Sequence, residues 1–191
     1  MADFRYETDR LILRDWLEED WEPFWRHLNT PTVTRYLGGI ADEEERRSAQ
    51  QRLAKYSRED GHTFWVVERK DDGGHLAGEI IGFCGLKRCR EKYGPIGDFK
   101  AGWRLREDAW GRGYAKEAAS ASLDLAFSRF DAPHVIALTH AANAPSWALM
   151  QRLGMARRED MDFPDGEPWA KGEMIIVYRL DREQWERLKH G

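Results

Sequence analysis

The sequence predicts an α+β domain built around a mixed, largely antiparallel sheet. Three observations favour this class: two helix patterns come early, a series of strand patterns fills the middle, and a strand-helix-strand-helix-strand unit closes the chain. A doubly wound fold would require stricter alternation of strands and helices. The 191 residues suit one compact domain, residues 1–191, better than two.

The N-terminal part carries one strand pattern and two helix patterns. Arg10–Arg14 (R-L-I-L-R) is typical of a short strand. The large apolar residues of Trp21–Leu28 recur at i, i+3, i+4 and i+7, which predicts a helix that Pro31 ends. Asp42 is followed three residues later by Glu45, so a capping box is expected at the start of a second helix that runs to about residue 58.

The rest of the chain alternates between short apolar runs and turn-forming residues. Strand patterns occupy Thr63–Arg69, Glu79–Leu86, Phe99–Leu105, His134–Thr139 and Glu173–Leu180, and the first two are expected to form a hairpin. Helix patterns occupy residues 113–130, a short segment that begins near Pro145 and that Gly154 ends, and a closing segment capped by Asp181–Gln184.

Composition and charge exclude several classes of protein. Charged residues make up 34% of the chain, and no stretch approaches the roughly eighteen apolar residues of a membrane span. The net charge of −4 gives no general attraction to nucleic acid. Cys84 and Cys89 lack the second ligand pair of a structural zinc site, so reduced thiols are expected. We therefore expect a cytoplasmic protein without a bound metal and without a membrane or a direct nucleic-acid partner.

The most informative stretch of the chain is Ala101–Ala118. A strand ends there, a turn with two glycines follows, and a helix begins at that turn. Free backbone N–H groups and the positive end of the helix dipole then point at one place, where a phosphate is stabilised. Gly111 and Gly113 let an anion approach the backbone, and Arg112 adds a positive charge at the rim.

The glycine turn alone is equally compatible with an ordinary helix start. It is not a P-loop, because no G-K-[S/T] follows, and it is not a Rossmann fingerprint, because the third glycine is missing. A nucleotide-binding function for this turn therefore needs support from other segments of the chain.

That support comes from a resemblance. Trp110–Ala118 (W-G-R-G-Y-A-K-E-A) resembles the coenzyme A signature of the GCN5-related N-acetyltransferases (GNAT), in the form of the RimJ/RimL-like ribosomal-protein N-acetyltransferase branch. In the general signature, [Q/R]-x-x-G-x-[G/A], Gly113 and Ala115 match, and Trp110 stands at the Gln/Arg position. Three further segments are similar to the family in the right order: Leu11–Arg14, Asn143–Met155 and Tyr178–Trp185.

The resemblance implies the GNAT fold, a twisted and mostly antiparallel sheet whose splayed central strands are flanked by helices. It implies acetyl-CoA as co-substrate and direct attack by a primary amine, either a protein N-terminus or a small molecule. The backbone from Trp103 through Leu105 to Arg106 is expected to pair with the pantetheine arm, and the N–H of Leu105 to stabilise the oxyanion. The pyrophosphate is expected on the backbone of Trp110, Gly111, Arg112, Gly113, Tyr114 and Ala115.

The same resemblance suggests roles for two later residues. Asn143 matches a polar contact to the coenzyme arm, with a turn residue or helix cap as the alternative. Ser146 matches a coenzyme contact and candidate general acid of the branch, with an ordinary helix N-terminal serine as the alternative. Met150 stands where many members have a tyrosine, and Lys100 where an acidic residue is often found. The general base stays open; the candidates are Asp98, Glu79, His140, Glu68 and a water relay.

The acceptor site is expected between the early helices, their connection Asn29–Ile40 and the late loop Phe163–Gly172. Asp165, Glu167 and Trp169 on that loop suit a cationic amine, although a solvated connection is an equally simple interpretation. The sequence does not name the acceptor. It also leaves open whether the protein forms a homodimer, and whether it is instead a catalytically weak acyl-CoA sensor.

Overall fold

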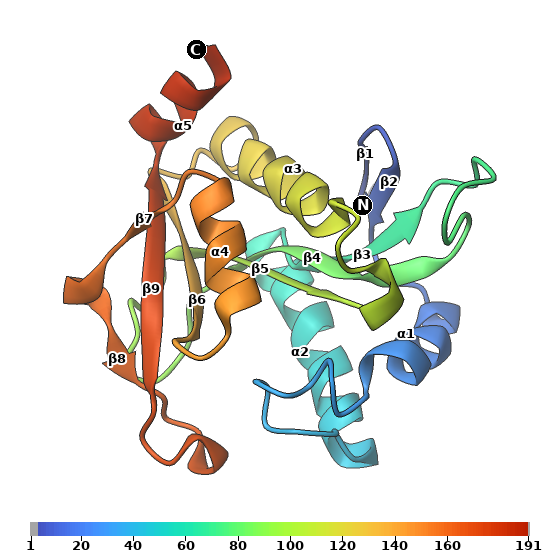
Figure 1. Ribbon diagram of the computed structural model, residues 1–191, viewed down its shortest axis with the longest axis horizontal. Helices are drawn as coiled ribbons and strands as arrows, with labels where there is room; N and C mark the ends of the chain where they lie inside the picture. Colours follow the sequence, from blue (N-terminus) through green and yellow to red (C-terminus); the bar gives the residue numbers. More distant parts are fainter. Residues whose placement is uncertain (1–3, 191) are drawn as a thin grey trace. The chain divides into compact units, whose positions relative to one another are not determined.

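The computed structural model describes residues 4–190 (Figure 1). It contains two compact units. The first comprises the chain up to Gly85 together with Trp103–Ala121, and the second comprises Leu86–Gly102 together with the chain from Ser122 onward. Three elements, β4, β5 and α3, run from one unit into the other.

The elements alternate as the sequence patterns predict. The helices are α1 Trp21–Leu28, α2 Glu43–Asp60, α3 Tyr114–Ser128, α4 Ala144–Arg152 and α5 Arg182–His190. The strands are β1 Arg5–Glu7, β2 Leu11–Arg14, β3 Phe64–Arg69, β4 Ile80–Arg88, β5 Phe99–Leu105, β6 His134–His140, β7 Ala156–Arg157, β8 Phe163–Pro164 and β9 Met174–Asp181. This mixed arrangement with a mostly antiparallel sheet confirms the predicted α+β class.

In the first unit the strands follow the order β1-β2-β3-β4-β5, with antiparallel pairing from β1 through β4. Helices α1 and α2 cover one face of these strands and the start of α3 covers the other (Figure 1). On the α1 face, Phe24 stacks on Phe83 of β4 at 5.9 Å. On the α3 face, Tyr114 accepts a hydrogen bond from Arg69 of β3. Aromatic packing and buried polar contacts thus lie on opposite sides of the sheet.

In the second unit the order is β5-β6-β9-β7, and β8 pairs with β9. β5 and β6 are parallel and pair over Phe99–Ala101, whereas β6 and β9 are antiparallel along their whole length. Helix α5 packs on the C-terminal half of α3, because Trp185 stacks on Phe127 at 5.0 Å and its indole donates to Asp124. The β5–β6 pair is thus parallel, in contrast to the antiparallel pairs on the other strands.

Local sequence signals are confirmed where they act over a few residues. Asp42 accepts from the N–H of Glu45, and the Glu45 carboxylate accepts in return, as a capping box requires. Gly154, at φ +80°, follows the end of α4. Both cysteines are buried, and neither forms a disulfide. The strands β1, β7 and β8 were not predicted, because two or three residues carry too little periodicity.

Within residues 4–190 no helix is long and apolar enough to cross a membrane. The same residues hold no group of three or more His, Cys, Asp or Glu side chains arranged for a metal ion.

Candidate active site

The turn between β5 and α3 has the geometry of an anion-binding helix start. Gly111 has φ +70° and Gly113 has φ +81°, a region that side chains disfavour, and a Cβ on Gly111 would meet no atom within 4 Å. The N–H of Glu117 makes an early helical bond of α3, to the Gly113 carbonyl at 3.0 Å. The N–H groups of the preceding first turn therefore have no partner within the helix.

Glu117 fixes the start of α3 to the start of β2. Its carboxylate accepts from the Thr8 hydroxyl at 2.5 Å, from the Arg10 N–H at 2.8 Å and from Arg10 Nε at 2.7 Å. Arg10 Nη1 also donates to the Arg112 carbonyl at 3.1 Å, inside the glycine turn. Burial opposes ionisation of Glu117, but the hydrogen bonds from Thr8 and Arg10 outweigh it and lower the pKa of the carboxyl.

Tyr114 supports the turn from beneath. Its side chain is buried, its hydroxyl donates to the His75 carbonyl at 3.3 Å, and Arg69 Nε donates to that hydroxyl at 3.1 Å. The guanidinium groups of Arg10 and Arg69 lie 4.6 and 5.2 Å from the centre of the tyrosine ring. The side chain of Tyr114 is thus used in contacts within the protein, and only its backbone contributes to the glycine turn.

The C-terminal part of β5 is held closely on β4. Gly82 has φ +149°, and a Cβ there would lie 2.0 Å from the Arg104 carbonyl oxygen, so only glycine allows this approach. The N–H of Arg106 donates to the Ile81 carbonyl in β4 at 2.9 Å. Because successive N–H groups of a strand point to opposite edges, the N–H of Leu105 points away from β4.

Trp110 connects the glycine turn back to β5. Its indole Nε1 donates to the Leu105 carbonyl at 2.8 Å, although the residue as a whole is 46% exposed. The parallel pairing of β5 with β6 covers Phe99–Ala101 and does not extend to Leu105. The indole of Trp110 thus adds a second constraint, beside the contacts with β4, on the strand residue whose N–H was predicted as the oxyanion donor.

The side chain of Arg106 is committed to internal ion pairs. Its guanidinium, 6% exposed as a residue, donates to Glu79 at 2.6 Å and to both oxygens of Asp108 at 2.6 and 2.7 Å. Burial opposes the charge, but the hydrogen bonds to Asp108 and Glu79 outweigh it and raise the pKa of Arg106. The side chain of Arg106 is therefore not available for the predicted coenzyme contact, and its backbone N–H is already bonded to Ile81. Trp103, the other strand residue expected to contact the coenzyme, is partly buried.

Asn143 and Ser146 lie in the second unit, at the start of α4. Asn143 occupies the N-cap position, but its side chain makes no capping hydrogen bond; its carbonyl accepts from the Ser146 N–H at 3.1 Å. A side-chain helix cap is therefore not the role of Asn143. Ser146 is partly buried and Met150 is buried. The first unit brings together Leu105, Arg106 and the turn Trp110–Ala115, whereas these two residues belong to the other unit.

Comparison with known proteins decides the family. Residues 10–156 match the family model described as the acetyltransferase (GNAT) domain, which is well over half of the chain. This chain belongs to the GNAT family. The N-acetyltransferase YnaD of Bacillus subtilis (strain 168), itself described as uncharacterized, is 27% identical over 181 residues, which cover 93% of this chain and 97% of that protein.

Solved structures show the same fold. An acetyltransferase from Agrobacterium tumefaciens str. C58 superposes with a TM-score of 0.77 at 24% identity and covers 95% of this chain and 96% of its own. A spermidine N-acetyltransferase from Vibrio cholerae, solved with CoA and spermine, has a TM-score of 0.68 at 15% identity and covers 94% and 99% of the two chains. The protein is an acetyltransferase of the GNAT fold.

The residues considered as general base in this GNAT acetyltransferase share one property, because each lies close to an ionisable partner. The pairs are Glu79 with Arg106 at 2.6 Å, Glu68 with Arg14 at 2.8 Å, Asp98 with His134 at 2.8 Å, and His140 with Asp165 at 3.0 Å. Lys100 is likewise held by Glu91. Geometry therefore singles out no base among them, and the assignment stays open.

The late loop is tied to β6 through His140. The buried imidazole places Nε2 at 3.0 Å from Asp165 and Nδ1 at 3.2 Å from Glu173, and Trp169 packs against it at 5.4 Å. Glu167 is exposed. Two of the three predicted acceptor-loop residues are thus organised around one histidine, a contact that no local sequence signal reveals.

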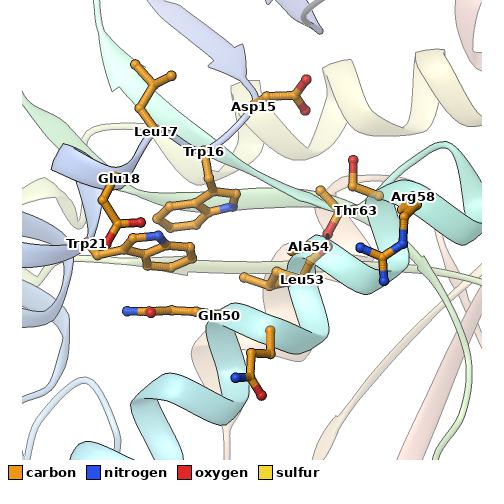
Figure 2. Close-up of a pocket in the computed structure, with 12 residues that line it drawn as sticks. Asp15, Trp16, Leu17, Glu18, Trp21, Gln50, Leu53, Ala54, Arg58 and Thr63 are labelled. Atoms are coloured by element: carbon orange, nitrogen blue, oxygen red, sulfur yellow. Dashed lines mark hydrogen bonds between the residues drawn. The ribbon is translucent and has the colours of Figure 1, made fainter. Parts of the chain in front are cut away.

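A cavity of about 540 Å³ opens beside the early helices of the first unit. In Figure 2 the stacked rings of Trp16 and Trp21, 3.8 Å apart, face Gln50 and Leu53 of α2. This is the region in which the acceptor site was expected. The connection Asn29–Ile40, which was expected to take part together with these helices, does not line the cavity.

We predict that Glu117→Gln lowers the free energy of unfolding by about 1–3 kcal/mol at neutral pH, because the charged acceptor of Thr8 and Arg10 is lost. The folded-state pKa of Glu117 is lowered, so its contribution is complete above the unfolded value of about 4.5 and disappears as pH falls through the folded value. Urea unfolding at pH 7 and at pH 3 measures this. Glu44→Gln, on an exposed side chain of α2, is the control; a difference from wild type that is the same at both pH values contradicts the prediction.

We also predict that Trp110→Phe, which keeps an aromatic ring but removes the N–H, lowers kcat for acetyl transfer about tenfold by loosening Leu105. Steady-state kinetics and an unfolding curve separate this from lost stability. Trp185→Phe is the control, because its indole donates to Asp124 outside the site. An unchanged kcat in Trp110→Phe shows that this hydrogen bond does not position a catalytic group.

Proposed function

We propose that this GNAT acetyltransferase uses acetyl-CoA and acetylates a primary amine by direct attack. The observation that carries the proposal is the turn Trp110–Ala115. Its N–H groups lie before the Glu117–Gly113 bond of α3, and the turn is held by hydrogen bonds from Arg10 to Glu117 and to the Arg112 carbonyl. A fixed helix start of this kind binds a pyrophosphate without further rearrangement. The spermidine N-acetyltransferase from Vibrio cholerae, whose structure was solved in complex with CoA and spermine, supports both substrate classes by analogy of fold.

The proposed reaction is a single acyl transfer. The amine nitrogen forms a bond to the thioester carbonyl carbon, the C–S bond breaks, and the thiolate leaves. An amine with its ordinary pKa, about 10 for lysine and about 8 for an α-amine, must first lose a proton. We assign the Leu105 N–H to the oxyanion of the tetrahedral intermediate and Ser146 to protonation of the thiolate. The proton of the amine leaves through an unassigned base or through water.

The coenzyme contacts follow the family resemblance. The pantetheine arm lies along Trp103, Leu105 and Arg106, and the first two offer it backbone groups, because the N–H of Arg106 is bonded to Ile81. The pyrophosphate is surrounded by Trp110, Gly111, Arg112, Gly113, Tyr114 and Ala115, and Asn143 and Ser146 complete the set. The side chain of Asn143 makes no capping hydrogen bond to α4. This supports its proposed contact with the coenzyme, because its amide is not used by the helix. Glu117 and Arg10 join it as positioning residues.

The finer placement of the protein rests on the four sequence segments that resemble the RimJ/RimL-like branch. On that basis we place it in this branch. From the composition and length of the chain we also propose that it acts in the cytoplasm and that residues 1–191 form one acetyltransferase domain. The acceptor is either a protein N-terminus or a small amine. A homodimer remains one of the oligomeric states open to it.

The proposed function is tested by the release of free thiol from acetyl-CoA in the presence of a panel of amines and peptides. We expect release by the wild type and none by Gly113→Glu, because a carboxylate in the turn repels the pyrophosphate. Gly61→Glu is the matched control: Gly61 has φ +72° with nothing within 4 Å of its Cβ, so it carries the same backbone strain at the end of α2. Isothermal titration with CoA is the second readout. Unchanged affinity in Gly113→Glu refutes the site, and binding without turnover on any acceptor identifies a sensor instead.

For Ser146→Ala we predict a kcat about tenfold lower, with near-normal CoA affinity, because the leaving thiolate loses its proton donor. The measurement is kcat across pH 6 to 9. A rate that matches the wild type over this whole range removes Ser146 from the mechanism.

A further inference from the structure

Among the described residues, three arginines in the interior of the first unit are paired with carboxylates, whereas Arg104 is not. The three, each at most 16% exposed at the side chain, make charge-assisted hydrogen bonds that compensate for the loss of water. The pairs are Arg14 with Asp20 and Glu68, Arg69 with Asp72, and Arg106 with Asp108 and Glu79. Burial of a guanidinium in this unit is therefore normally matched by an anion.

Arg104 is the exception. It lies on β5 directly before Leu105, and its Nε is buried without a hydrogen-bond partner among residues 4–190. Its guanidinium lies 5.3 Å from the centre of the Phe83 ring, and this ring is the contact that replaces a carboxylate. Burial lowers the pKa of Arg104 to about 10, so the group is still a cation at neutral pH. The first unit thus holds a desolvated positive charge for which it supplies no anion.

A second unpaired donor belongs to the same aromatic cluster. The indole Nε1 of Trp25 in α1 is buried and has no acceptor within the described part of the chain. Trp25 packs on Phe24 at 5.0 Å, and Phe24 stacks on Phe83 at 5.9 Å. Two orphan N–H donors, one charged and one neutral, therefore border one Phe24–Phe83 pair. Orphan buried donors are rare in folded proteins, and two on one cluster call for an acceptor that comes from outside.

We propose that Arg104 and Trp25 bind the carboxylate of the acceptor, so that the substrate is an amino acid or a related small amine that carries a carboxylate. This rests on the proposed acetyl transfer, because Arg104 immediately precedes the residue whose N–H is assigned to the oxyanion. A guanidinium presents a planar fork that matches a carboxylate, and the indole N–H supplies a further donor of fixed direction. A polyamine, which has no anion, would leave the Arg104 charge unpaired and add a like charge beside it.

The experiment compares matched pairs of acceptors that differ only in the carboxylate. Acetyl transfer to L-phenylalanine and γ-aminobutyrate is measured against transfer to their amides, with kcat/KM expressed per unprotonated amine because the carboxylate also changes the amine pKa. For the wild type we expect the acids to exceed the amides at least about tenfold. In Arg104→Gln this ratio falls to about one, in Arg104→Lys it is partly restored, and in Trp25→Phe it falls about threefold.

The control is Arg129→Gln, which removes another arginine placed over a phenylalanine ring, at 5.6 Å from Phe130, and should keep the wild-type ratio. Three results overturn the proposal: amides or spermidine acetylated as well as the acids, phosphoethanolamine preferred to every carboxylate, or CoA affinity that falls in Arg104→Gln. If only the amides are acetylated, the carboxylate proposal is wrong but the proposed acetyl transfer to amines stands. If thiol is released without any amine, the proposed acetyl transfer is itself refuted. If Arg104→Gln fails to fold, Arg104→Lys and Trp25→Phe still decide the matter through the ratio.

Discussion

The contact between Glu117 and Arg10 is the interaction on which the rest of the proposed coenzyme site depends. A helix start with unpaired N–H groups attracts an anion only if its backbone stays in place, and glycines on both sides of Arg112 give that backbone little stiffness of its own. Glu117 supplies the missing constraint by accepting from the backbone and side chain of Arg10 at once. Its negative charge also lies near the positive end of the α3 dipole, which favours the ionised form.

The constraint extends from the helix to the strand. Arg10 donates to the Arg112 carbonyl, and Trp110 returns from the same turn to the Leu105 carbonyl. The turn, the helix start and the end of β5 are thus joined by hydrogen bonds that are all made within the first unit. A displacement of α3 would therefore reach Leu105 through the Arg10–Arg112 and Trp110–Leu105 hydrogen bonds. The Glu117 carboxylate and the end of β5 are therefore connected through Arg10 and the turn that contains Arg112 and Trp110.

The sequence predicts this region unevenly, for a physical reason. The capping box at Asp42 and the glycine turn before α3 depend on neighbours within a few residues, so their patterns are visible in the chain. The contact of Glu117 with Arg10 spans 107 positions, and only the fold brings the two together. The candidate bases show the same limit. From the sequence alone, Glu79 and Glu68 are plausible bases. Their arginine partners are distant in the sequence and become evident only in the folded structure.

The polar groups of the first unit fall into two classes, and the two proposed ligands account for the difference. The network around Glu117 is satisfied internally. This suits the proposed coenzyme phosphate, because a phosphate at a helix start needs a rigid set of backbone N–H groups and not a free side-chain charge. Arg104 and Trp25 are unsatisfied within the described residues, although an anion within the chain would have relieved both. In the same unit Arg14, Arg69 and Arg106 each have a carboxylate partner. A carboxylate partner for Arg104 would therefore have been compatible with the fold. The unpaired donors of Arg104 therefore suit a ligand that arrives and leaves, since a permanent internal anion would compete with it.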